Sequence, residues 1–147
     1  MTYYLNEGQQ FSILHWGIFV LVIITLAAGC GTPGKNIQVT EGTAVMGADR
    51  IQVLNVQVES FYYKPSRIQV AVNQPVRLIL KSGAFIIPHN FTLHAPEAGI
   101  DINRGIGPGK TVAIEFTPTK TGEYSFFCGK DGHAKKGMGG TLVVVSQ

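Results

Sequence analysis

The chain has 147 residues, a net charge of +3 at pH 7, 45% hydrophobic residues and only 14% charged residues. This length allows one compact domain with an appendage and excludes a multidomain enzyme. The basic residues neither run together nor alternate with aromatic residues, which argues against nucleic-acid binding, and the low charged fraction indicates that some apolar surface faces lipid or a partner.

The N-terminal part of the chain is predicted to be a signal or membrane-anchor segment over residues 1–30. Phe11 to Ala28 is apolar and carries no formal charge, at the short end of what spans a bilayer as a helix. The following Ala27-Ala28-Gly29-Cys30 resembles a bacterial lipobox, so we expect lipidation at Cys30. An uncleaved membrane helix is the alternative, because the first residues include Glu7 but no Lys or Arg. Both interpretations place the remainder at the outer face of the cytoplasmic membrane or in the periplasm of a prokaryote.

Residues 31–50 are predicted to form a flexible tether. They are rich in Gly, Thr and Ala, include Pro33, and hold neither a period of 2 nor one of 3.6. The folded domain is therefore expected over residues 51–147.

Short segments with β-branched and aromatic residues and strand-like alternation follow, separated by turn signals such as Gly107-Pro108-Gly109. They run over Gln52 to Glu59, Arg67 to Val72, Val76 to Lys81, His89 to Ala95, Thr111 to Thr117, Glu123 to Phe127 and Thr141 to Val145. Seven or eight strands in one small domain predict an all-β, antiparallel Greek-key β-sandwich. The side chains expected to point inward are Leu54, Val56, Val58, Ile68, Val70, Leu78, Leu80, Ile114, Phe116, Tyr124, Phe126 and Val143.

Three kinds of metal-ligating side chain share the loop between the last two predicted strands. Cys128, His133 and Met138 follow one another at intervals of five. A thiolate, an imidazole and a weak thioether together favour copper over structural zinc. A trigonal copper site needs a second imidazole, and His89 at the head of an upstream strand supplies it. His94 has the opposite parity on that strand and is expected at the surface.

These motifs resemble those of the cupredoxins, the blue-copper family, over roughly Gln52 to Val145. Pro88-His89-Asn90 resembles the first-ligand motif of plastocyanin, and Gly122 to Cys128 resembles the strand that delivers the ligand cysteine. The spacing of the later ligands is closer to auracyanin and azurin. The resemblance implies one type 1 copper ion with His89, Cys128 and His133 as equatorial ligands and Met138 as the axial ligand. It also implies that the Asn90 side chain hydrogen-bonds toward the cysteine loop.

A site with this ligand set has no open position for a small-molecule substrate, so we expect one-electron transfer and no enzyme activity. The sequence thus predicts a membrane-tethered blue copper protein that exchanges electrons with redox proteins or a membrane complex. Two alternatives stay open: a copper subunit of a respiratory or photosynthetic membrane complex, and a periplasmic copper carrier. With Met138 as the single usable methionine, the site favours retention of the metal over its transfer.

The resemblance also implies that His133 is the port through which electrons pass, reached through an apolar patch. Lys130, Lys135 and Lys136 lie in the same loop and only Asp131 opposes them. We therefore expect a redox partner with an acidic docking face. The alternative is that these lysines only keep the loop soluble.

Overall fold

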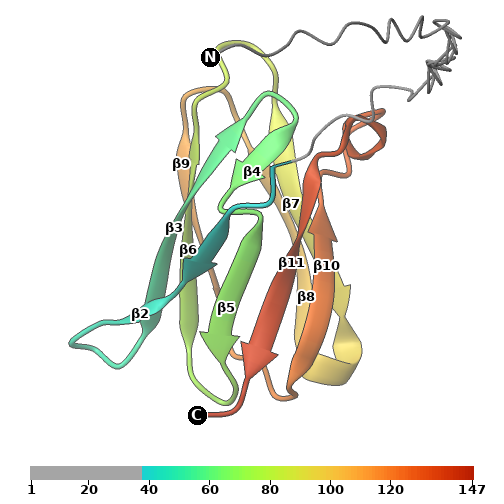
Figure 1. The fold of residues 1–147 in the computed structure, drawn as a ribbon. Coiled ribbons are helices and arrows are strands. Elements are labelled where there is room, and N and C mark those ends of the chain that lie inside the picture. Colours follow the sequence, from blue (N-terminus) through green and yellow to red (C-terminus); the bar gives the residue numbers. More distant parts are fainter. Residues whose placement is uncertain (1–37) are drawn as a thin grey trace, which may run out of the picture. The chain divides into compact units, whose positions relative to one another are not determined.

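The computed structural model describes residues 38–147, which form two β-sheets that pack against each other (Figure 1). One sheet holds, in spatial order, β1(Glu41–Thr43), β5(Arg67–Ala71), β11(Gly139–Val145), β10(Gly122–Phe127), β7(His89–Ala95) and β8(Ile100–Ile106). The other holds β2(Val45–Met46), β3(Gln52–Glu59), β6(Val76–Ser82) and β9(Thr111–Phe116), with β4(Tyr62–Lys64) beside β3. Two short 3₁₀ helices complete the domain, η1(Pro96–Ala98) and η2(Ala134–Lys136). Within this described part of the chain, no helix is long and apolar enough to cross a bilayer.

The predicted β-sandwich is confirmed, but its strand pairing is mixed rather than antiparallel throughout. Strand β5 runs parallel to both β1 and β11, and β3 runs parallel to β6. Between β3 and β6 the chain passes through β5 in the opposite sheet before it returns. Such a crossover brings two strands side by side in the same direction, which a tight hairpin cannot do.

Strands β1 and β2 fall inside the segment that we predicted to be a tether. Thr40, just before β1, is tied to Ser66 by two hydrogen bonds of 3.1 Å, from Thr40 N to Ser66 Oγ and from Ser66 N to Thr40 Oγ1. The sandwich therefore begins ahead of Ile51, and the tether prediction is wrong for residues 41–46. Residues 1–37 lie outside the described residues, and with them the predicted anchor, Cys30 and the first part of the tether.

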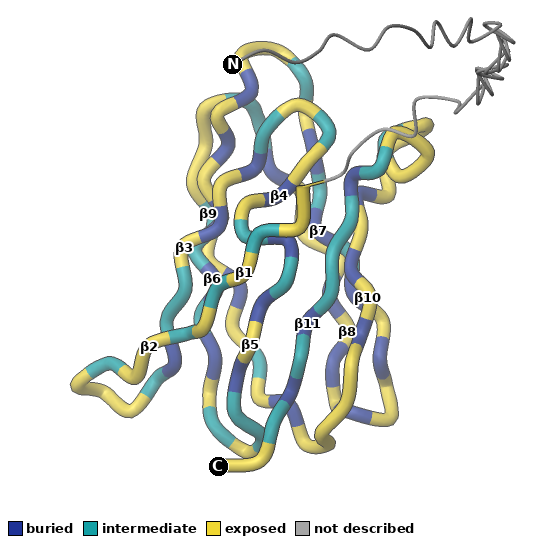
Figure 2. Tube along the Cα trace, viewed as in Figure 1, coloured by how far each residue is buried: buried dark blue, intermediate teal, exposed yellow. Residues whose placement is uncertain are grey.

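The core lies between the two sheets and follows the alternation of the strands (Figure 2). Nine of the twelve side chains predicted to point inward are buried, while Leu54 and Phe116 are partly buried against this core. Val143 is the exception, because its neighbours Leu142 and Val144 are the buried residues of β11. In the register of the sheet, Val143 instead stands opposite Glu123 and Gln69.

Strand β10 presents Tyr124 and Phe126 to the core, and Cys128 follows with the same parity. Phe126 pairs across the ladder with Gly140. A Cβ atom at Gly140 would overlap the Phe126 ring and the carbonyl oxygen of Ser66, so only glycine fits there. Close packing on both sides thus fixes the strand that ends at Cys128.

Candidate metal centre

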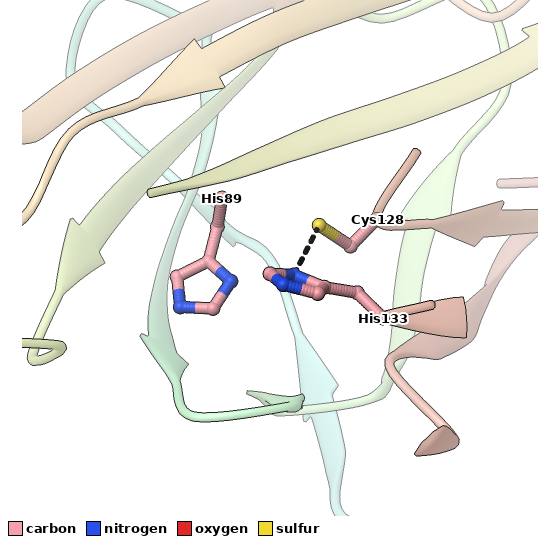
Figure 3. A group of neighbouring side chains, drawn as sticks. All are labelled: His89, Cys128 and His133. Carbon is pink, nitrogen blue, oxygen red and sulfur yellow. Dashed lines mark hydrogen bonds between the residues drawn. The ribbon is translucent and has the colours of Figure 1, made fainter. Parts of the chain in front are cut away.

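Three of the predicted ligands meet at one end of the sandwich (Figure 3). His89 is the first residue of β7, Cys128 directly follows β10, and His133 precedes η2. Because β7 and β10 are neighbours in one sheet, paired at Thr92 and Phe127, the first two ligands end up side by side. The donor atoms of His89, Cys128 and His133 all lie within 4.8 Å of one another.

His89 is a fully buried imidazole whose two ring nitrogens have no hydrogen-bond partner among the described residues. Burial lowers the pKa of His89, and the nearby His133 lowers it further, so the ring is neutral and keeps a lone pair for coordination. A buried polar atom without a partner is costly and calls for an explanation. A metal ion bound between His89, Cys128 and His133 supplies it, so these residues fit a resident metal.

Cys128 is buried among apolar side chains, and its sulfur faces polar groups on two sides. The backbone N–H of Asn90 donates to Cys128 Sγ over 3.5 Å, and His133 Nδ1 lies 3.3 Å from the same sulfur (Figure 3). A thiolate needs such donors or a cation when it is taken out of water. The sulfur is therefore placed to bind a metal that the two imidazoles share.

His133 is half-buried and is the more solvent-facing of the two imidazoles. Its ring meets the edge of Phe61 with ring centroids 5.0 Å apart, and the ring of His89 is 5.2 Å away. The ammonium group of Lys136 sits 4.0 Å from the centroid of the Phe61 ring, a cation–π contact. His133 thus connects the buried cluster to the protein surface.

Met138 is fully buried at the end of the segment that we call the ligand loop, residues 128–138. Its carbonyl oxygen accepts a hydrogen bond from Cys128 N over 3.0 Å, and its N–H donates to the carbonyl oxygen of His133 over 3.2 Å. The backbone therefore holds Met138 beside two of the ligands. The axial role of its thioether stays a prediction.

Asn90 joins the first-ligand strand to the ligand loop. Its Oδ1 accepts a hydrogen bond from Gly129 N over 2.6 Å. Its Nδ2 donates to Thr92 Oγ1 over 3.0 Å and to Asn103 Oδ1 over 2.9 Å. Asn90 therefore lies where the sequence predicted it, bridging two segments that each carry a ligand.

Two residues at the site escaped the sequence reasoning, Phe61 and Tyr63. Both belong to the β3–β4 hairpin of the opposite sheet, and the Tyr63 hydroxyl donates to the carbonyl oxygen of Asn90 over 2.5 Å. The only signal in the sequence is the aromatic run Phe61-Tyr62-Tyr63 after a predicted strand. His94 is exposed as predicted, and its Nδ1 lies 3.1 Å from Asp101 Oδ1.

Comparison with known proteins agrees with this geometry. The model of the cupredoxin-like domain family matches residues 18–144. No curated protein is similar enough to the chain to count as a match.

Solved structures share the fold. The metal-binding domain of CopA, the Cu(I)-exporting P-type ATPase of Streptococcus pneumoniae, is 25% identical, with a TM-score of 0.56 over 74% of this chain and 99% of that one. Auracyanin from Roseiflexus castenholzii is 19% identical, with a TM-score of 0.56 over 67% and 99%. A chain of a heme-copper terminal oxidase dimer is 22% identical, with a TM-score of 0.56 over 73% and 72%.

The fold and the ligand cluster together support electron transfer by copper. His89, Cys128 and His133 provide the nitrogen and sulfur donors of one type 1 copper site. The chain therefore belongs to the cupredoxin family.

Proposed function

We propose that the protein is a membrane-tethered carrier of single electrons, which it exchanges with redox proteins or a membrane complex outside the cytoplasm. The observation that carries this proposal is the donor set of the buried His89 and Cys128 with the half-buried His133, in which both nitrogens of His89 lack a hydrogen-bond partner among residues 38–147. When bound there, copper supplies a one-electron couple between Cu(I) and Cu(II). His89, Cys128 and His133 would hold it, together with Met138.

The protein's contribution is to hold these ligands nearly still. His89 and Cys128 stand at the ends of neighbouring strands, and the hydrogen bond from Cys128 N to Met138 O closes the ligand loop. Asn90 adds a bond between the two segments. Ligands held in this way rearrange little between oxidation states, which favours rapid electron exchange and retention of the metal.

A charge-transfer absorption tests the copper–thiolate site. The full-length protein loaded with Cu(II) should show an intense visible band, and Cys128→Ser should remove it. His94→Ala is the matched control, because this exposed histidine lies outside the cluster and its loss should leave the colour intact. A colourless wild type, or a Cys128→Ser variant with the same band, would disprove the assignment.

Electrons are proposed to enter and leave at His133, next to a basic patch formed by Lys130, Lys135 and Lys136. All three lysines are exposed. The loop before His89 adds apolar surface, since Phe85 is 94% exposed and Ile86 75% exposed. An apolar contact beside positive charge suits a partner with an acidic docking face.

Ionic strength tests this docking model, because exposed charges are screened beyond a Debye length of about 8 Å at physiological salt. Electron transfer to the native partner should slow as salt rises, and Lys135→Glu should weaken that dependence. Lys120→Glu makes the same charge change just before the start of β10, whereas Cys128 follows the end of that strand. This variant should leave the salt dependence of the rate unchanged. A rate that is independent of salt, or equal effects of the two variants, would remove the electrostatic steering.

The membrane tether is proposed from the sequence of residues 1–30, with lipidation at Cys30 or retention of the apolar segment as its two forms. Mass spectrometry of the native N-terminus distinguishes them. Acyl chains on a new N-terminal Cys30 identify a lipoprotein, and an intact Met1 identifies a retained segment. Recovery of the protein from the cytoplasm without either feature would contradict both forms.

Two other roles remain for the same site. The likeness to the metal-binding domain of a Cu(I) exporter favours a copper carrier, and the likeness to an oxidase chain favours a fixed subunit of a membrane complex. A carrier would pass Cu(I) to an acceptor protein faster than it exchanges electrons. A fixed subunit would co-purify with its complex in constant proportion, whereas an electron carrier would do neither.

A further inference from the structure

Tyr63 reaches the site from the opposite sheet. It lies on β4, and its side chain is buried, with 2% exposed. Its ring meets Phe91 and Phe126 edge to face, with ring centroids 5.8 and 5.3 Å apart, and those two rings stack on each other at 4.6 Å. This aromatic cluster leaves the Tyr63 ring little freedom and fixes the position of its hydroxyl.

The Tyr63 hydroxyl ends beside the first-ligand strand and the ligand cysteine. It donates a hydrogen bond to the carbonyl oxygen of Asn90. Burial raises the pKa of Tyr63 above its ordinary value, and the nearby Cys128 raises it further. The phenol is therefore a neutral donor to the carbonyl oxygen of Asn90.

Asn90 is held through its side chain and its carbonyl oxygen, and these contacts limit the movement of the residue whose N–H faces Cys128. The side-chain oxygen accepts from Gly129 N, while the side-chain amide donates to Thr92 and Asn103. The bond from Tyr63 fixes the remaining polar backbone atom, the carbonyl oxygen. What this bracing holds in place is the Asn90 N–H, which points at Cys128 Sγ over 3.5 Å.

We propose that Tyr63 is a positioning residue of the copper site, whose hydroxyl holds the Asn90 N–H against the Cys128 sulfur and thereby raises the reduction potential. This inference rests on the proposed copper function. Hydrogen bonds around the cysteine sulfur tune the potential of blue-copper sites. A donor at the sulfur withdraws electron density from the thiolate, so the thiolate stabilises Cu(II) less. Loss of the Tyr63 hydroxyl should therefore lower the potential.

If Tyr63 had a purely structural role, loss of its hydroxyl would change stability but not the reduction potential. Tyr124 provides the control for this alternative. Tyr124 is also buried, and its hydroxyl also donates to backbone carbonyls, those of Lys120 at 3.1 Å and Thr121 at 3.3 Å. These carbonyls precede the start of β10, whereas Cys128 follows its end. Tyr63→Phe and Tyr124→Phe thus each delete one buried hydroxyl, at the site and away from it.

The experiment compares the two variants in the copper-loaded, full-length protein by voltammetry, visible absorption and urea unfolding. In Tyr63→Phe, the affinity for Cu(II) relative to that for Cu(I) should rise about threefold. At about 59 mV per factor of ten, this change lowers the reduction potential by about 30 mV. The charge-transfer band of this variant should move as well. Tyr124→Phe should lose stability and keep both the wild-type potential and the wild-type band.

A wild-type potential in Tyr63→Phe, or equal shifts in both variants, would overturn the inference. Should Tyr63→Phe fail to fold, replacement of all tyrosines by 3-fluorotyrosine in the Tyr124→Phe background keeps it testable. The more acidic hydroxyl should bind Asn90 more tightly and raise the potential, and an unchanged potential would overturn the inference. A wild type that binds Cu(II) without colour would instead overturn the proposed function and this inference together.

Discussion

Replacing Asn90 with alanine tests how far copper affinity depends on the brace between the two ligand segments. The change removes three side-chain hydrogen bonds, from Gly129 N at 2.6 Å and to Thr92 and Asn103 at 3.0 and 2.9 Å. A hydrogen bond contributes about 0.5–1.5 kcal/mol net. Two of the three partners are exposed and can bind water instead, so we expect a loss of about 1.5–2.5 kcal/mol in the free energy of unfolding. Removing a group that orients metal ligands typically costs about 10–100-fold in metal affinity, which we expect here.

Urea unfolding of the copper-free protein measures the first quantity, and competition with a chelator of known affinity measures the second. Asn103→Ala is the matched control, because it removes one bond of Asn90 and leaves the bond to Gly129 in place. It should cost about 1 kcal/mol or less and change copper affinity little. Copper affinity of Asn90→Ala within threefold of the wild type would refute the bracing role, as would an equal loss in Asn103→Ala.

Three further predictions concern the axial ligand, the packing and the acid stability. Met138→Gln should lower the reduction potential and Met138→Leu should raise it, both with copper bound, and voltammetry without a change in either would mean that Met138 is not axial. Gly140→Ala should destabilise the domain by about 1–3 kcal/mol because its Cβ has no room, whereas Gly105→Ala, with open space at that position, should be neutral or slightly stabilising in the same thermal unfolding assay. A hydrogen bond and the positive charge of Arg67 lower the pKa of Glu123, so the stability that this pair contributes is complete above the ordinary carboxyl pKa and is lost as pH falls through the lowered value. In Glu123→Gln, the free energy of unfolding should fall less steeply at acidic pH than in the wild type. The same fall in both proteins would show that the Arg67–Glu123 pair does not contribute to the pH dependence.

The ligand set could be predicted because metal-ligating residue types follow one another closely in the last loop of the sequence. Several strands could not be predicted. Strand β8 was missed since Asp101, Asn103 and Gly105 are poor strand formers, although Ile100 and Ile102 alternate correctly. Its formation depends on pairing with β7 along its whole length, a tertiary effect.

The prediction that Val143 points inward was wrong for a related reason. The run from Leu142 to Val145 is apolar on both faces, so a period of 2 cannot say which face is inward. Its register is set by β5 and β10 on either side. Tyr63 was missed because it contacts Asn90 across the space between the two sheets. No local sequence pattern indicates such a long-range contact.

The ligand loop is closed at its base by the hydrogen bond from Cys128 N to Met138 O, at 3.0 Å. Inside it the bonds are local, from His133 N to Lys130 O at 3.0 Å and from Gly137 N to Ala134 O at 2.9 Å. A residue gained or lost between Cys128 and His133 would therefore be absorbed within this closed ring, while the β10–β11 ladder keeps its register. The number of residues between the ligands can therefore change during evolution without disturbing the sheets. Copper sites of different geometry can then arise in the same sandwich by exchange of this one loop.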